Sequence, residues 1–132
     1  MPEPDELESG DADLGSGGPL VLPGVNYVLG GGKTGYMYLL DRSSMQLQQR
    51  LTAATSLYNT NPDSRWNAWD TGPHLHGSPT FWPGLGFLYV WGEKDYLKLY
   101  AFDATTNKFI DKPIHTYTTT PAQPDTMPGG MM

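Results

Sequence analysis

Short apolar segments recur along the chain, and most of them end at a turn rich in Gly, Pro, Asp or Ser. Residues 19–22 stop at Pro23-Gly24, and residues 36–40 stop at Asp41. Apolar runs of this length with such boundaries are typical of antiparallel strands. The pattern predicts strands at 19–22, 26–29, 36–40, 46–51, 80–82, 87–91, 97–102 and 108–110.

The second half of this pattern repeats the first. Residues 27–47 align without a gap with residues 89–109, an offset of 62 (from 27 to 89). Upstream, residues 17–24 align with residues 77–84 at an offset of 60. Four short antiparallel strands per repeat are typical of a β-propeller blade. The predicted fold class is therefore all-β, with two four-stranded antiparallel blades that oligomerisation would complete.

The repeat also divides the chain. We expect an acidic N-terminal segment (1–14), a first blade (15–58), a connecting loop (59–76), a second blade (77–115) and a flexible tail rich in Thr, Pro and Gly (116–132). Gly129-Gly130 aligns with Gly17-Gly18, so the sequence ends where a third repeat would start, as in a fragment of a longer reading frame. Two blades leave two apolar faces without a neighbour. Two, three or four identical chains would close a ring.

The segment GGGKTG at residues 30–35 resembles the start of a phosphate-binding loop. Its GKT at residues 32–34 lacks the first Gly that the loop places five residues earlier, where this chain has Tyr27, and we expect a strand after it where a phosphate-binding loop needs a helix. The aligned segment of the second copy, GEKDYL, has lost most of these glycines. We interpret residues 30–35 as a hairpin turn. The turns at Asp41 and Asp103 are structural in the same interpretation, because both copies need them.

Charge and composition exclude several classes of function. The net charge is −6, but six acids precede the first Lys or Arg, so the remaining eight acids balance eight bases. We therefore expect no basic surface for nucleic acid. The sequence also contains no apolar run long enough to span a membrane and no basic amphipathic helix. The chain has no Cys, which excludes disulfides and thiolate chemistry. Its start lacks a signal peptide, so as written it would be cytoplasmic.

Two groups of residues carry candidate chemistry. Asp11 and Asp13 precede Gly15, a pattern that can turn carboxylates toward Ca²⁺; the alternative is a solvated acidic turn. His74 and His76 are two residues apart, so in an extended chain both rings point to one side and can meet one metal ion. Asp70 would be a third ligand or would orient a His, and His115 is a further candidate. A neutral His could instead act as a general base, or these residues could simply cap a loop between blades.

The segments DADLGSGGPLVLPG, VLGGGKTGYMYLLDRSSM, HGSPTFW and LYVWGEKDYLKLYAFD resemble the quinoprotein-like β-propellers built from PQQ-type repeats. The resemblance covers residues 11–110. It implies the propeller fold, a periplasmic or secreted parent family and a PQQ-dependent dehydrogenase activity. No residue of this chain matches the quinone-stacking group of that family, and the adjacent Cys pair is missing. We therefore do not expect PQQ to bind.

Three functions remain open at this point. The first is a binding or assembly module that takes a small-molecule ligand at a blade junction and forms a homo-oligomer. The second is a calcium- or other divalent-metal-dependent hydrolase of lactones or esters, using Asp11, Asp13, Asp70, His74 and His76. The third is a PQQ-dependent oxidoreductase.

Overall fold

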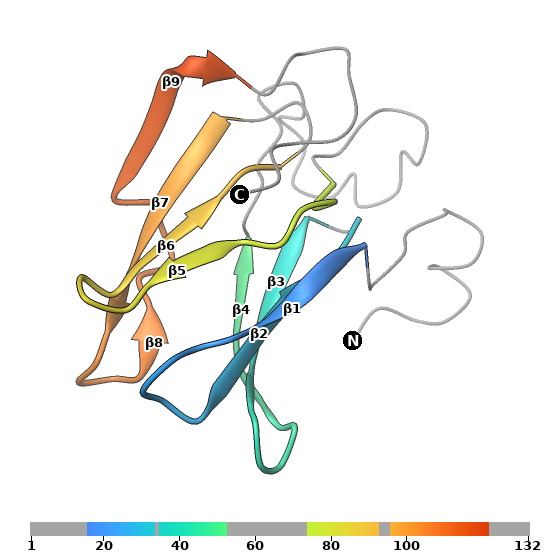
Figure 1. Cartoon of the computed structure of the whole chain (residues 1–132), viewed down its shortest axis with the longest axis vertical. Coiled ribbons are helices and arrows are strands. Elements are labelled where there is room, and N and C mark those ends of the chain that lie inside the picture. Colours follow the sequence, from blue (N-terminus) through green and yellow to red (C-terminus); the bar gives the residue numbers. More distant parts are fainter. Residues whose placement is uncertain (1–15, 34, 53–73, 93–95, 122–132) are drawn as a thin grey trace.

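The chain folds into two antiparallel β-sheets that lie against each other (Figure 1). The computed structural model describes residues 16–33, 35–52, 74–92 and 96–121, and within these ranges there is no helix. An all-β fold was expected from the sequence and is confirmed. No helix of the described ranges is long and apolar enough to cross a membrane.

The first sheet is a meander of four strands in chain order. It consists of β1 (Gly17–Val21), β2 (Tyr27–Gly31), β3 (Tyr36–Asp41) and β4 (Leu47–Thr52), each antiparallel to the next. The hairpin between β2 and β3 closes where the amide of Gly35 donates to the carbonyl of Gly32 at 3.1 Å. A strand follows this glycine-rich turn, as predicted, so the segment is a hairpin and not a phosphate-binding loop.

The second sheet repeats the meander and adds a strand. It contains β5 (Thr80–Trp82), β6 (Phe87–Val90), β7 (Tyr96–Asp103) and β8 (Lys108–Phe109). The fifth strand, β9 (His115–Pro121), pairs with β7 on the same edge as β8. We expected a flexible tail from Thr116, and the structure differs: residues 116–121 belong to β9. The Thr- and Tyr-rich composition of this segment favours a strand.

The hairpin turns after β3 and β7 share one geometry, which supports the sequence repeat at the level of atoms. Met45 and Asn107, 62 residues apart, have φ values of 57° and 56°. Positive φ is uncommon outside glycine, so its recurrence at matched positions is specific. After each turn the register also agrees, because Leu40 pairs with Leu47 and Phe102 pairs with Phe109.

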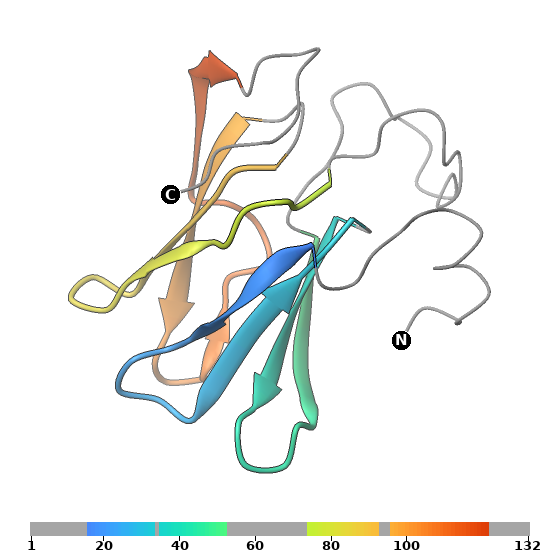
Figure 2. The ribbon, with the colours of Figure 1, turned by 45° about the vertical axis from the view of Figure 1, so that its right-hand side comes forward.

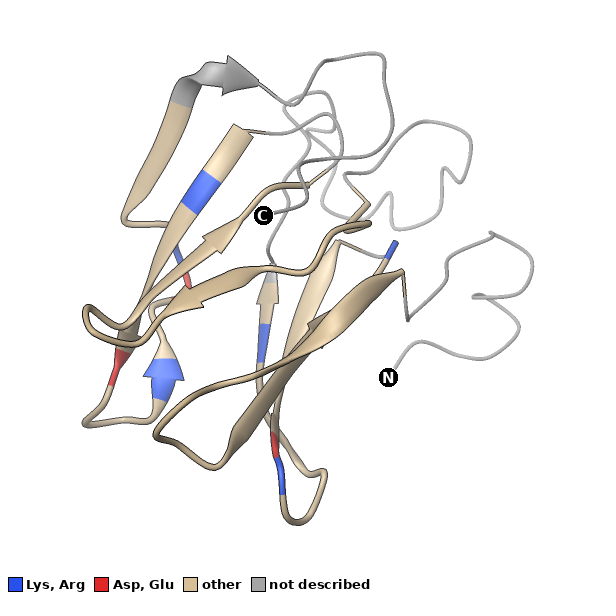
Figure 3. Cartoon of the chain, viewed as in Figure 1, with Lys and Arg blue, Asp and Glu red and all other residues tan. Residues whose placement is uncertain are grey.

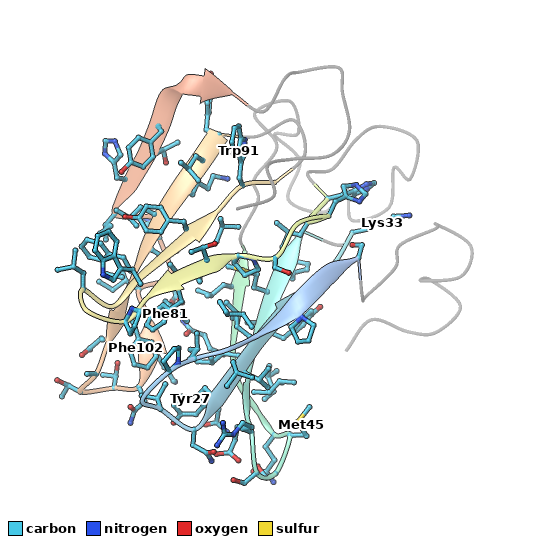
Figure 4. All side chains as sticks on the ribbon, in the orientation of Figure 1. Tyr27, Lys33, Met45, Phe81, Trp91 and Phe102 are labelled. Carbon is cyan, nitrogen blue, oxygen red and sulfur yellow. The ribbon has the colours of Figure 1, made fainter. Side chains whose placement is uncertain are left out.

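One hydrophobic core lies between the two sheets, whose arrangement Figure 2 shows from a second side. Three phenylalanines of the second sheet meet edge to face, and two of them, Phe81 and Phe102, are labelled in Figure 4. Edge-to-face packing is the favoured arrangement of aromatic rings. The buried members of the core are Leu22, Leu29, Met37, Leu39, Leu51, Leu75, Leu88, Val90, Tyr100 and Phe109.

The two sheets present opposite faces of their repeats to this core. On β3, Met37 and Leu39 belong to the core cluster. Of the residues 62 positions after them, Leu99 is buried but lies outside this cluster, and Ala101 is only half-buried. On β7 the core instead takes Tyr100 and, in part, Phe102, which align with outward residues of β3. Successive side chains of a strand point to opposite faces. The sheets therefore pack front to back: the face that the first sheet turns to the core corresponds, in the repeat, to the outer face of the second sheet. Equivalent faces of the two repeats do not meet.

Candidate functional site

The two histidines singled out from the sequence lie together on the segment that precedes β5. The ring centroids of His74 and His76 are 5.6 Å apart, and the rings meet edge to face at 70°. Both side chains are half-buried. This is the arrangement expected for two residues on the same side of an extended chain.

Leu75, between the two histidines, fixes this segment to the first sheet. Its side chain is buried in the core, and its amide donates to the carbonyl of Gly32 at 3.2 Å. Its carbonyl accepts a hydrogen bond from the hydroxyl of Ser16 at 2.6 Å. Because the residue between the histidines is held on both sides, their backbone position is defined by the start of β1 and the end of β2.

The other predicted ligands are not joined to this pair in the described part of the chain. Asp11, Asp13 and Asp70 lie outside the described residues. His115 is on β9, where its ring contacts that of Tyr117 with centroids 4.4 Å apart. In residues 16–33, 35–52, 74–92 and 96–121, no three His, Asp or Glu side chains gather as metal ligands. Within these residues, His115 therefore does not gather with His74 and His76.

The histidine pair supplies two of the ligands that a zinc site needs. A tetrahedral catalytic site usually has three protein ligands and one water molecule. A neutral imidazole can also accept a proton from water without a metal. A metal site at this pair thus needs a further ligand, whereas proton transfer from water does not.

A cleft lies between the two sheets at β4 and β8, and the side chain of Gln49 organises it. The amide nitrogen of this side chain donates to the carbonyl of Phe109 at 2.7 Å, and its oxygen accepts from the amide of Phe109 at 2.8 Å. The side chain therefore pairs with Phe109 as a neighbouring strand would. The same nitrogen also donates to a carboxylate oxygen of Asp111 at 2.8 Å.

This cleft has a volume of about 680 Å³, within the usual range for a small-ligand site. Its charged side chains are two acids and one base, Asp103, Asp111 and Lys108. PQQ is a planar tricarboxylate, so two acids against one base do not fit it. The lining is completed by Gln49, Thr106, Phe109 and Ile110.

This cleft could not be predicted from the sequence, because it depends on how the two sheets meet. The pattern predicts a strand at 46–51 but assigns no role to a glutamine within it. One sequence feature does indicate such a role, because side chains of a strand alternate between its two faces. Gln49 lies two residues before the buried Leu51 and therefore points to the same inward face. A polar residue at an inward position needs a hydrogen-bonding partner.

The two aspartate turns are hydrogen-bonded in the same way. Asp41 accepts from the amides of Ser43 and Ser44, at 2.9 and 2.8 Å, and Asp103 accepts from the amide of Thr105 at 2.8 Å. These backbone donors favour the ionised carboxylate, so the pKa of each aspartate is lowered below its usual value. Both carboxylates are occupied within their own turns, which supports a structural role.

Comparison with known proteins does not assign this site. No family model matches the chain, and neither a curated protein nor a solved structure matches it.

Proposed function

We propose that the chain is a two-repeat unit of a β-propeller of the quinoprotein-like type and that it acts as a binding and assembly module. The observation that carries this proposal is the front-to-back packing of the two sheets. Blades of a propeller follow one another with the same face forward, and each contacts only its neighbours. Two sheets packed by equivalent faces would have argued for a closed sandwich instead.

Such a unit needs neighbours on both sides. Propellers close at about four to eight blades, so two, three or four copies of a two-blade chain would complete a ring. A small polar ligand would bind at the junction of β4 and β8, where side chains of both signs line the cleft.

The first test is the mass of the protein in solution, measured by light scattering with and without calcium. We expect a defined multiple of the chain mass that calcium does not change. A monomer at all concentrations would contradict the assembly function. Calcium-dependent association would instead favour the metal-dependent function described next.

A divalent-metal-dependent hydrolase of lactones or esters is a second candidate, favoured by the contact between His74 and His76. With Asp70 or the Asp11 and Asp13 carboxylates as further ligands, a metal ion would activate water there. This function requires turnover that a chelator and His74→Ala both abolish. His115→Ala is the matched control, because that ring lies on β9. A quinone absorbance that stays with the protein after free PQQ is removed, with quenching of Trp fluorescence, would instead support an oxidoreductase.

A further inference from the structure

An apolar row crosses the outer face of the first sheet, away from the core. Val21 pairs with Val28, Val28 with Leu40, and Leu40 with Leu47, so the row takes one residue from each strand. The two ends of the row are about half exposed, Val21 at 49% and Leu47 at 55%. We call these four residues the front row.

The positions of the front row are the ones that the second sheet uses to bind the first. Val21 aligns with Phe81 at the offset of 60, and Leu40 and Leu47 align with Phe102 and Phe109 at the offset of 62. Those three phenylalanines form the aromatic group of the core, with ring centroids 5.1 to 6.2 Å apart. The front row therefore repeats, on an open face, a surface already adapted to pack on another sheet.

A second apolar row crosses the outer face of the second sheet. Trp82 pairs with Phe87, Phe87 pairs with Ala101, and the amide of Ile110 donates to the carbonyl of Ala101. Trp82 is 56% exposed and Ile110 is 49% exposed. We call these four residues the back row.

The back row likewise repeats the surface by which the first sheet binds the second. Trp82 aligns with Leu22 at the offset of 60, and Ala101 aligns with Leu39 at the offset of 62; Leu22 and Leu39 are both buried core residues. Neither row contains a charged residue, although each sheet carries a basic residue within a strand, Arg50 on β4 and Lys98 on β7 (Figure 3). The back row thus corresponds to the core face of the first sheet, and the front row to the core face of the second sheet. The two outer faces therefore match each other as the two core faces do.

We infer that a second copy of this chain docks through these rows, with the back row of one copy on the front row of the next. This inference rests on the proposed assembly function and specifies its surfaces. The contact joins two different surfaces, so it is head-to-tail and adds copies until a ring closes. A contact between equivalent surfaces would instead stop at two copies.

Two double variants test the inference, with mass measured by light scattering. Val21→Glu with Leu47→Glu places charge on the front row, and Trp82→Glu with Ile110→Glu places charge on the back row. Each variant alone should be a monomer, because burying an unpaired charge is costly. An equimolar mixture should form a 1:1 heterodimer, since each variant keeps the row that the other lacks. Ile114→Glu, an exposed side chain outside both rows (45%), is the control and should keep the wild-type mass.

The outcomes separate this inference from the function on which it rests. A wild-type assembly that both double variants preserve would overturn the docking surfaces and leave the assembly function standing. Folded monomeric variants that do not combine on mixing would overturn the head-to-tail arrangement. A monomeric wild-type protein would overturn both. Cooperative thermal unfolding checks that each variant folds, and the single variants Leu47→Glu and Ile110→Glu replace any double variant that does not.

Discussion

Two adjacent glycines near the end of β2 differ in the space around them. A Cβ atom on Gly31 would lie 2.7 Å from the carbonyl oxygen of Tyr36 and 2.9 Å from a methyl carbon of Leu75, whereas one on Gly30 would meet nothing within 4 Å. We expect Gly31→Ala to lower the free energy of unfolding by about 1–3 kcal/mol through overpacking. Gly30→Ala should be neutral or stabilise by about 0.5 kcal/mol. Urea denaturation of both variants measures this, and equal effects would contradict the packing described for Gly31.

The aspartate turns predict a dependence of stability on acid. Asp41 and Asp103 have pKa values lowered from 3.8 in the folded chain by hydrogen bonds from their own turns. A lowered pKa stabilises the fold fully above the unfolded pKa, and this stabilisation is lost as the pH falls through the folded pKa. The double variant Asp41→Asn with Asp103→Asn should therefore melt below wild type at pH 7, and the gap should narrow below about pH 4. Thermal melts across this range measure the gap, and a gap independent of pH would show that the carboxylate charge is not involved.

At the scale of elements, one side chain joins β4 to β8. Gln49 both donates to and accepts from the backbone of Phe109. Gln49→Ala leaves those backbone groups without this partner, which we expect to lower the free energy of unfolding by about 1–3 kcal/mol. Gln48→Ala is the matched control, because that side chain bonds only the nearby carbonyl of Gln46 and should change stability by less than about 0.5 kcal/mol. Urea denaturation separates the two, and equal losses would mean that the Gln49 pairing contributes nothing.

The strands that the sequence could predict are those whose signal is local. All eight expected strands are present within one or two residues at each end, because apolar runs and Gly, Pro and Asp turns mark their boundaries. Strand β9 was missed because its residues pair with β7 only after the chain bends through 110–114 and returns to the same edge. That return depends on tertiary pairing and not on the local pattern.

The candidate sites also divide into one that local sequence predicts and one that depends on tertiary structure. The approach of His74 to His76 was predictable, because strand geometry alone places residues two apart on one side. The cleft at Gln49 was not predictable, since its walls come from residues about 60 positions apart. Neither the repeat nor its turns specify which face of a sheet becomes buried. The choice of opposite faces appears only when the two sheets are seen together.

For the whole molecule, a single core shared by both sheets predicts that they unfold together. Leu39 lies on β3, is fully buried and belongs to the cluster that includes Leu88 and Tyr100 of the second sheet. Leu39→Ala should lower the free energy of unfolding by about 2–5 kcal/mol. Native-state hydrogen exchange should then show the amides of β6 and β7 losing as much protection as those of β2 and β3. Leu85→Ala, at an exposed turn, should leave both sheets unchanged within about 0.5 kcal/mol. Loss of protection in the first sheet alone would mean that each sheet is stable without the other, and a chain built that way would not need front-to-back neighbours at all.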